Sequence, residues 1–207
     1  MPSEPHKKRP LSLLLFYALC RVFFRLFNSL EVKGLDRIPA AGPLIIACNH
    51  LSNSDPPALT STLALVRRPN VIAKKELFSY WPIGPILRSW GCIPVDRARE
   101  GGDLGALRGC LTALKKGGCL IIFPEGTRAR GRKLTPKPGV ALIAHKSGAP
   151  VLTARIFNSD NFSKLGKITI KYGTLRNFEP PADGDLKAAY ASFSETLMAD
   201  IFSIKEE

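Results

Sequence analysis

Histidine and cysteine, the side chains most used for metal binding and nucleophilic chemistry, are few or scattered in this chain. No motif contains two of the three histidines, which disfavours a metallohydrolase. The five cysteines are odd in number and form no C-x-x-C pair, so neither a zinc site nor a disulfide framework is expected. No serine lies in a G-x-S-x-G turn, and no cysteine has a base beside it in the sequence. An activated serine or cysteine nucleophile is therefore not expected either.

Internal repeats, low-complexity stretches and linkers are also absent, so the 207 residues suit one domain with a substantial core. Positive charge, in contrast, is abundant: 30 Lys and Arg against 17 Asp and Glu give a net charge of +13. Because 45% of the residues are hydrophobic, the chain combines an apolar and a basic character. This combination indicates an anionic partner, namely nucleic acid, a phosphate-bearing substrate or an anionic membrane face. The basic loop at residues 128–139 has no aromatic residue for base stacking, which argues against nucleic acid.

The first 30 residues differ in character from the rest. A polar, basic start precedes the apolar stretch 11–27, which Arg21 and Arg25 interrupt before it reaches the length of a membrane span. Because Arg21, Arg25 and Asn28 share one helical stripe, the pattern predicts an amphipathic helix lying in a membrane interface. The alternative is a helix packed on the core of the domain. We expect residues 1–30 to form this basic, interfacial segment and residues 31–207 to form the main domain.

Three short apolar runs each end in polar residues. The run at 43–48 leads into His50 and Asp55, the run at 91–95 ends in Asp96-Arg97, and the run at 120–123 leads into residues 124–128. In a parallel α/β sheet the carboxyl ends of the strands share one edge, where ligands bind. The sequence therefore predicts a base and two guanidinium groups, those of Arg97 and Arg128, on a single rim.

His50 and Asp55 have the spacing of a possible acid–base pair. If the turn between them is tight, one ring nitrogen can bond to the carboxylate while the other remains free to take a proton near neutral pH. The alternative is a capped turn with no chemical role. Spacing alone favours the capped turn, so further motifs are needed to support a catalytic pair.

The remaining pattern predicts an α/β fold, with a mostly parallel central sheet flanked by helices. We expect helices over 57–68, 101–116, 139–147 and 185–204, and further strands over 70–73, 151–157 and 167–172, the last as an edge strand. Asp103 is a candidate N-cap, and His145 is expected to be structural. The stretch 81–87, which Pro and Gly interrupt, is either a groove wall, a membrane contact or ordinary core.

From about residue 44 to residue 156 the chain resembles the PlsC-type glycerolipid acyltransferases, and especially the 1-acylglycerol-3-phosphate (lysophosphatidate) acyltransferases. Four blocks carry the resemblance and occur in the family's order: N-H-x-x-x-x-D at 49–55, the stretch from Lys74 to Arg97, F-P-E-G-T-R at 123–128 and G-A-P-V at 148–151. A serine often follows the third block, where this chain has Ala129. The charged residues of the block are intact.

The resemblance implies transfer of a fatty acyl group from acyl-CoA or acyl carrier protein to the sn-2 hydroxyl of lysophosphatidate, giving phosphatidic acid. His50 would be the general base and Asp55 its partner, with no acyl-enzyme, no metal and no cofactor beyond the acyl donor. Substrate binding would fall to six residues: Lys74, Arg97, Glu125, Gly126, Thr127 and Arg128. For Glu125, an ion pair with Arg97 or Arg128 is an alternative role. The expected location is the cytoplasmic face of the inner or cell membrane, on anionic lipids.

Two other readings stay open at this point. A related acyltransferase could use another lysophospholipid or an ornithine lipid as acceptor. A non-catalytic relative could bind a membrane or nucleic acid. The acyl chain length, the donor, the oligomeric state and the depth of the first helix in the bilayer do not follow from the residues.

Overall fold

The computed structural model describes residues 10–96 and 103–206. Within these ranges, seven strands form one sheet in the order β1-β7-β6-β2-β5-β3-β4. Neighbouring strands are parallel except for β6 and β7, so the mostly parallel α/β sheet that the sequence predicts is confirmed. The strands are β1 (Glu31–Lys33), β2 (Leu44–Cys48), β3 (Pro69–Lys74), β4 (Ile93–Val95), β5 (Cys119–Ile122), β6 (Val151–Phe157) and β7 (Thr169–Arg176).

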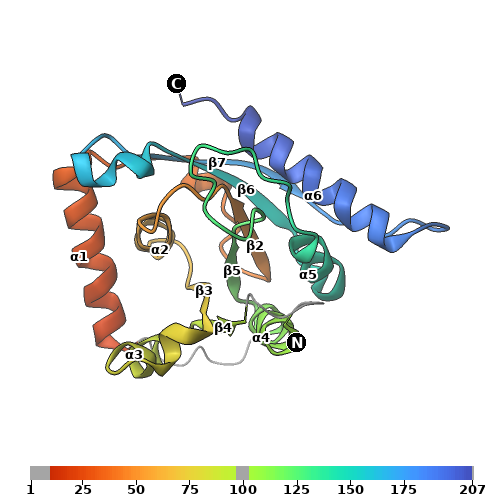
Figure 1. Ribbon diagram of the computed structural model, residues 1–207, viewed down its shortest axis with the longest axis horizontal. Helices are drawn as coiled ribbons and strands as arrows, with labels where there is room; N and C mark the ends of the chain where they lie inside the picture. The colour runs from red at the N-terminus through yellow and green to blue at the C-terminus, as the bar shows by residue number, and fades with distance from the viewer. Residues whose placement is uncertain (1–9, 97–102, 207) are drawn as a thin grey trace.

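Helices cover both faces of this sheet (Figure 1). The α-helices are α1 (Leu11–Phe27), α2 (Asp55–Leu63), α3 (Ile83–Ser89), α4 (Leu104–Lys115), α5 (Gly139–Ser147) and α6 (Leu186–Ser203), with short 3-10 turns η1 (Leu35–Arg37), η2 (Lys75–Ser79) and η3 (Ser159–Lys164). Every residue of the central strand β2 is buried, and its side chains alternate between the two faces. Ile46 belongs to the core beneath α1 and α2, whereas Ile45 belongs to the core beneath α4, α5 and α6.

This arrangement brings the ends of three predicted strands to one edge. β2, β5, β3 and β4 run parallel as consecutive neighbours, so the residues that follow β2, β4 and β5 leave the sheet on the same side. The segment after β5 then contacts the segment after β2 directly, because the Ala129 N–H donates to the His50 carbonyl at 2.8 Å. A shared rim for the His50 and 124–128 segments is thereby established.

Two elements differ from the sequence-based prediction. The helix expected over 57–68 begins at Asp55 and ends at Leu63, after which the chain tightens into bonds between residues three apart. The strand β7 is not an edge strand, because β1 pairs with it on the side away from β6. Since β1 covers only Thr169–Lys171, the far end of β7 stays exposed, which explains its edge-like alternation of apolar and polar residues.

Helix α1 is packed on the domain and is also apolar on its outer side. Leu13, Tyr17 and Phe24 are buried, and Phe24 joins the core beneath α2. The outward stripe is nevertheless aliphatic, with exposed side chains at Leu11, Leu15, Leu19, Val22 and Leu26. Among the described residues, no helix is long and apolar enough to cross a bilayer. The core-packed alternative therefore accounts for one face of α1 and leaves the opposite face without a protein partner among the described residues.

Candidate active site

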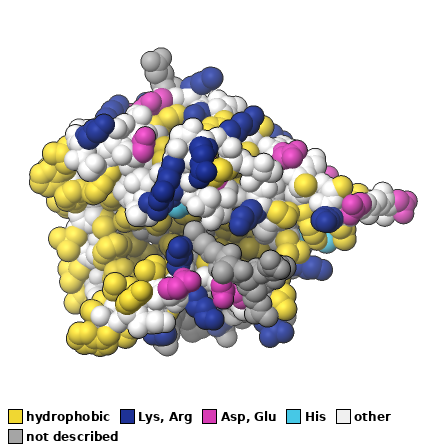
Figure 2. Space-filling view, in the orientation of Figure 1, with side chains coloured by type: hydrophobic (Ala, Val, Ile, Leu, Met, Phe, Trp, Pro, Cys, Tyr) yellow, Lys and Arg dark blue, Asp and Glu magenta, His cyan; other side chains and the backbone are white. Residues whose placement is uncertain are grey.

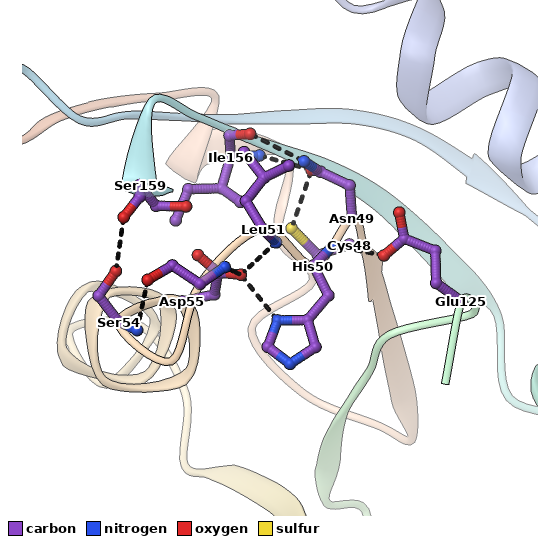
Figure 3. A network of polar contacts seen from close by, with 10 residues as sticks. Cys48, Asn49, His50, Leu51, Ser54, Asp55, Glu125, Ile156 and Ser159 are labelled. Carbon is purple, nitrogen blue, oxygen red and sulfur yellow. Dashed lines mark hydrogen bonds and ion pairs between the residues drawn. The ribbon is translucent and has the colours of Figure 1, made fainter. Parts of the chain in front are cut away.

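His50 lies where β2 opens into a loop, and the segment after β5 contacts it at three points, of which Figure 3 shows the one with Glu125. The Phe123 ring stacks on the imidazole with a centroid separation of 4.2 Å and an angle of 20°. The Glu125 Oε2 accepts a hydrogen bond from the His50 backbone N–H at 2.5 Å, and the Ala129 N–H donates to the His50 carbonyl. The histidine is therefore buried and fixed in both ring and backbone.

Asp55 is the first residue of α2 and is fully buried. Its Oδ2 lies 2.7 Å from His50 Nδ1 and accepts hydrogen bonds from the backbone N–H groups of Leu51 and Ser52 at 2.7 and 2.8 Å. The first turn of a helix also favours a negative charge, since the helix dipole is positive there. The carboxylate is thus held against one ring nitrogen, and Nε2 points away from it (Figure 3).

Two residues that the sequence motifs did not single out as functional fix this loop to the neighbouring strand. The Asn49 side chain accepts a hydrogen bond from the Ile156 N–H at 2.8 Å and donates one to the Ile156 carbonyl at 2.9 Å. The Ser54 hydroxyl donates to the Ser159 carbonyl at 3.1 Å. Asn49 is the first fixed position of the N-H-x-x-x-x-D block at 49–55, although the block alone assigns no role to it. Both side chains are buried, so the turn from His50 to Asp55 is anchored at each end.

A cavity of about 610 Å³ opens beside His50. Thr127, Arg128 and Lys74, three of the residues predicted to bind substrate, line it together with His50. Most of the rest of the wall is apolar and comes from α1, α2, β3, η2 and α3, with these residues among them: Leu13, Phe16, Tyr17, Pro56, Pro57, Val71, Leu77, Leu87 and Trp90. The cavity therefore combines the histidine and two cationic side chains with a largely apolar wall. The space-filling view shows a hollow flanked by Lys and Arg side chains (Figure 2).

The other predicted binding residues are placed differently. Glu125 is buried and does not line the cavity, and its carboxylate forms no ion pair with Arg128; the alternative pairing with Arg97 stays a prediction, because Arg97 lies outside the described residues. Gly126 has a φ of +70°, and a Cβ there would lie 2.8 Å from the Lys137 side chain. Arg97 lies outside the described residues, so its predicted position on the rim stays a prediction.

Burial changes the titration of two groups at the site. It raises the pKa of Glu125 from 4.5 to about 7, helped by the nearby Asp55 carboxylate and opposed by the hydrogen bond from the His50 N–H. It also raises the pKa of Cys92, which lines the cavity, to about 11. A thiol with this pKa stays protonated at neutral pH and is a poor nucleophile. Among the described residues, no group of three or more His, Cys, Asp or Glu side chains has the arrangement to hold a metal ion.

His145, the histidine expected to be structural, contacts α6. Its Nδ1 lies 2.7 Å from the Tyr190 hydroxyl, and its ring packs at 5.2 Å from that of Phe178. It does not line the cavity, in agreement with a structural role.

Comparison with known proteins gives this arrangement a family. The model of a family described as Acyltransferase matches residues 29–157, which include β2, the His50–Asp55 turn and the 123–128 segment. The chain belongs to this acyltransferase family. The spacing of His50 and Asp55 agrees with the H-x-x-x-x-D motif, and the resemblance to PlsC-type enzymes is thereby confirmed.

Individual relatives are about 30% identical to this acyltransferase over the aligned residues, and one solved relative has the same fold. The crystal structure of the 1-acyl-sn-glycerophosphate acyltransferase PlsC from Thermotoga maritima superposes with a TM-score of 0.71 at 27% identity, covering 94% of this chain and 80% of that one. A chloroplastic 1-acyl-sn-glycerol-3-phosphate acyltransferase of Brassica napus is 29% identical over 153 residues, 72% of this chain and 44% of its own length. The Bacillus subtilis enzyme of the same description is 31% identical over 134 residues, 65% of each chain. The chain thus spans under half of the plant relative and just under two thirds of the bacterial one.

Proposed function

We propose that this acyltransferase moves a fatty acyl group from an acyl thioester to the sn-2 hydroxyl of lysophosphatidate, forming phosphatidate. One observation carries the proposal: a single cavity joins the free side of His50 to two cationic side chains, Lys74 and Arg128, and to a long apolar wall. A lysophospholipid with a phosphate head and an acyl tail has these same three parts. The relatives at about 30% identity are 1-acyl-sn-glycerol-3-phosphate acyltransferases, which supports this choice of acceptor.

In this proposal His50 is the general base. Its Nε2 takes the proton of the acceptor hydroxyl as the oxygen attacks the thioester carbonyl, and the resulting imidazolium returns the proton to the departing thiolate. Asp55 keeps the other nitrogen, Nδ1, protonated and stabilises the imidazolium through the 2.7 Å contact. Proton transfer of this kind contributes about 10²–10⁴-fold to the rate, and holding both substrates in place contributes much of the rest.

Direct attack without an acyl-enzyme fits the groups around the cavity. Cys92 is the thiol that lines it, and its raised pKa keeps it protonated. The buried Cys48 beside the Asn49–His50 turn has a pKa far above its ordinary value, again because of burial. Neither sulfur is therefore prepared as a nucleophile, and the acceptor hydroxyl is left to react directly with the donor.

Arg128, Lys74 and Thr127 are the candidates for the acceptor phosphate. A guanidinium binds phosphate through two parallel N–H groups, a lysine adds a point charge, and a threonine hydroxyl donates one hydrogen bond. All three line the cavity that His50 lines. Arg97 stays a fourth candidate on the strength of its sequence motif alone.

Glu125 and Gly126, predicted from sequence as substrate-binding residues, suit a different part in this scheme. The Glu125 carboxylate is occupied by the His50 N–H, so we assign it to holding the base in position. The positive φ of Gly126 allows the chain to turn so that Glu125 reaches inward while Thr127 and Arg128 reach the cavity. Both residues then support substrate binding through the shape of the 123–129 segment.

The apolar wall formed by α1, α2 and α3 suits the acyl chains. It is continuous with the outer side of α1, where exposed Leu and Val side chains would enter the acyl layer of a membrane. Arg21 and Arg25 flank this stripe and would meet anionic headgroups. We therefore place the enzyme on a membrane surface through α1, with its lipid acceptor drawn from the same surface. Either acyl-CoA or acyl carrier protein, both anionic, suits the basic rim as donor.

The acceptor is tested by a panel. Purified protein is given one acyl thioester and, in turn, lysophosphatidate, other lysophospholipids, glycerol 3-phosphate and an ornithine lipid, and the acylated product is quantified. The proposal predicts the highest kcat/KM with lysophosphatidate. A higher value with another acceptor would identify a related acyltransferase instead, and no product with any acceptor would revive a binding role.

A further inference from the structure

Exposed apolar side chains gather on a second element besides α1. From η2, through the residues that connect it to α3, and into α3, large apolar side chains face solvent; we call this set the aromatic tip: Leu77, Tyr80, Trp81, Ile83 and Ile86. Trp81 is 87% exposed and Tyr80 is 61% exposed, although both are large aromatic residues that usually gain from burial. An apolar patch of this kind on a soluble surface marks a site of interaction.

The aromatic tip is presented by a fixed backbone. Phe78 is buried on the inner side, and the Arg88 guanidinium donates to the Phe78 carbonyl at 2.9 Å. The Gly84 N–H donates to the Tyr80 carbonyl at 2.7 Å, and a Cβ at Gly84 would lie 2.1 Å from the Phe78 carbonyl oxygen. The close packing of η2 against α3 therefore directs the inner residues toward the protein and leaves Tyr80 and Trp81 outside.

Direct contacts tie this segment to α1. The Phe16 and Trp90 rings lie 4.6 Å apart, and Trp90 Nε1 donates to the Ser12 hydroxyl at 3.3 Å. α3 lies at one end of α1 (Figure 1), and hydrophobic side chains continue along the same side of the molecule over both helices (Figure 2). Residues of both elements, among them Phe16 and Leu77, also line the cavity beside His50.

The charges within α1 and α3 have one sign, and Glu76 of η2, beside Leu77, is an exposed acidic residue next to the aromatic tip. Neither α1 nor α3 contains an acidic residue, whereas Arg21, Arg25 and Arg88 lie within them. Basic residues beside exposed aliphatic side chains match the headgroups and acyl chains of an anionic bilayer. Trp and Tyr are favoured at the level of the headgroups, where an apolar ring and a polar N–H or O–H are both satisfied.

We propose that the aromatic tip is a second membrane-insertion element, which enters an anionic bilayer together with α1. The inference rests on the proposed function, which places α1 on a membrane, and adds a contact that fixes the orientation of the protein. With two contacts, the cavity wall shared by α1 and α3 faces the lipid, so an acceptor can pass from the bilayer toward His50 without crossing water.

The chain contains two tryptophans, which makes the test direct. In the variant Trp90→Phe, Trp81 is the only tryptophan and is excited selectively over the tyrosines at the red edge of the absorption band, while phenylalanine keeps the ring contact with Phe16. We expect its emission to shift to shorter wavelength, and to be quenched, when vesicles of phosphatidylcholine and phosphatidylglycerol with brominated acyl chains are added. In the reciprocal variant Trp81→Phe, Trp90 is the one remaining tryptophan. Its emission reports changes that occur elsewhere in the protein and serves as the control. Both variants are compared with wild-type protein by circular dichroism to verify folding.

Vesicle cosedimentation supplies the second measurement. Trp81→Ser should weaken vesicle binding by about tenfold or more. The reason is that the variant loses an aromatic side chain that enters the bilayer in the membrane-bound protein. Leu104→Ser, which removes an exposed apolar side chain at the start of α4, should leave binding unchanged.

Three outcomes would overturn the inference. Cosedimentation with an unchanged Trp81 emission would mean that α1 binds alone and the tip stays in water, with the proposed function intact. A Trp81 shift that depends on protein concentration without lipid would mean that a second copy covers the tip. Absence of all vesicle binding would show that neither α1 nor the aromatic tip enters the bilayer. Failure of the proposed function itself is recognised separately, as the absence of acyl transfer to lysophosphatidate in detergent micelles, where no bilayer contact is needed.

Discussion

Glu125 is the residue whose assigned part changes most once its surroundings are known. Its motif resembles a substrate-binding block, yet its carboxylate accepts the His50 N–H at 2.5 Å and does not line the cavity, whereas the adjacent Thr127 and Arg128 do. Phe123 and Ala129, on either side in the sequence, contact the ring and the carbonyl of the same histidine. The 123–129 segment thus holds His50, the proposed base, and also contributes Thr127 and Arg128 to the cavity.

The first prediction tests whether Glu125 positions His50 or binds the substrate. Glu125→Ala removes the acceptor for the His50 N–H, and we expect kcat to fall by about 10- to 100-fold because the base is misplaced, with little change in the KM for lysophosphatidate. Glu125→Gln keeps a carbonyl oxygen at the same place and should retain most of the kcat. Steady-state kinetics of the two variants provide the measurement. A rise in acceptor KM with unchanged kcat would instead show that Glu125 binds substrate.

The raised pKa of Glu125 predicts a pH-dependent stability. The folded protein binds this proton more tightly than the unfolded chain, since the pKa rises from 4.5 to about 7 on burial. The contribution of this group to the free energy of unfolding is therefore full below about pH 4.5 and falls as the pH rises through about 7. Glu125→Gln does not titrate, so its Tm relative to wild type should increase between about pH 5 and pH 8. A Tm difference that stays constant over this range would contradict the assignment.

For individual residues, type and spacing in the sequence predict which side chains are functional, but they do not predict which way each side chain points. The His50–Asp55 pair follows from a strand end and a five-residue separation, and the two side chains do meet. The inward orientation of Glu125 depends on the positive φ of Gly126 and on the packing of Lys137 beside it, which no spacing rule conveys. Asn49 was missed for the same reason, since its partner lies more than 100 residues away in the sequence.

Among the elements, the loop between β2 and α2 depends on its attachment to β6. The Asn49 side chain makes two buried hydrogen bonds to the backbone of Ile156, in effect extending the pairing of β2 and β6 beyond Cys48 and Ala154. The position of His50 therefore depends on a side chain that does not itself line the cavity.

Removal of this attachment should cost stability as well as activity. Asn49→Ala leaves the Ile156 N–H and carbonyl without their side-chain partners in a buried place, and we expect the free energy of unfolding to fall by about 1–3 kcal/mol. Asn53→Ala, an exposed asparagine of the same loop, is the matched control and should have no measurable effect on stability. Equal denaturant midpoints for Asn49→Ala and wild type would show that the attachment is not needed.

The elements that were predicted correctly are those whose signal is local. Asp103 caps α4 through hydrogen bonds to the Gly105 and Ala106 N–H groups, as its type and place indicate. The inner position of β7, one strand from the edge, depends instead on pairing with the three-residue strand β1, whose residues lie 138 positions earlier in the chain. The early start of α2 depends on Asp55 being drawn into the first turn by its bonds to Leu51 and Ser52. Long-range pairing and loop closure are the parts of the fold that periodicity does not reveal.

For the whole molecule, the most important feature is how the polar edge of the sheet lies relative to the apolar surfaces of α1 and the aromatic tip. The edge of the sheet that carries His50, Thr127 and Arg128 opens into the same cavity whose apolar wall runs toward α1 and α3. The exposed aliphatic side of α1 and the aromatic tip extend that apolar character to the outside. A protein organised in this way can hold an amphipathic acceptor with its hydroxyl at the base and its chain toward a membrane.

The most direct measurement of the central claim is thiol release from an acyl thioester, with and without lysophosphatidate, for wild type and His50→Ala in parallel. The account predicts release that requires both lysophosphatidate and His50, with a loss of about 10²–10⁴-fold or more in the variant. Circular dichroism of His50→Ala verifies that the variant is folded. Release that His50→Ala retains at a tenth of the wild-type rate, or release that is independent of lysophosphatidate, would contradict the assignment of His50 as the base for this acceptor.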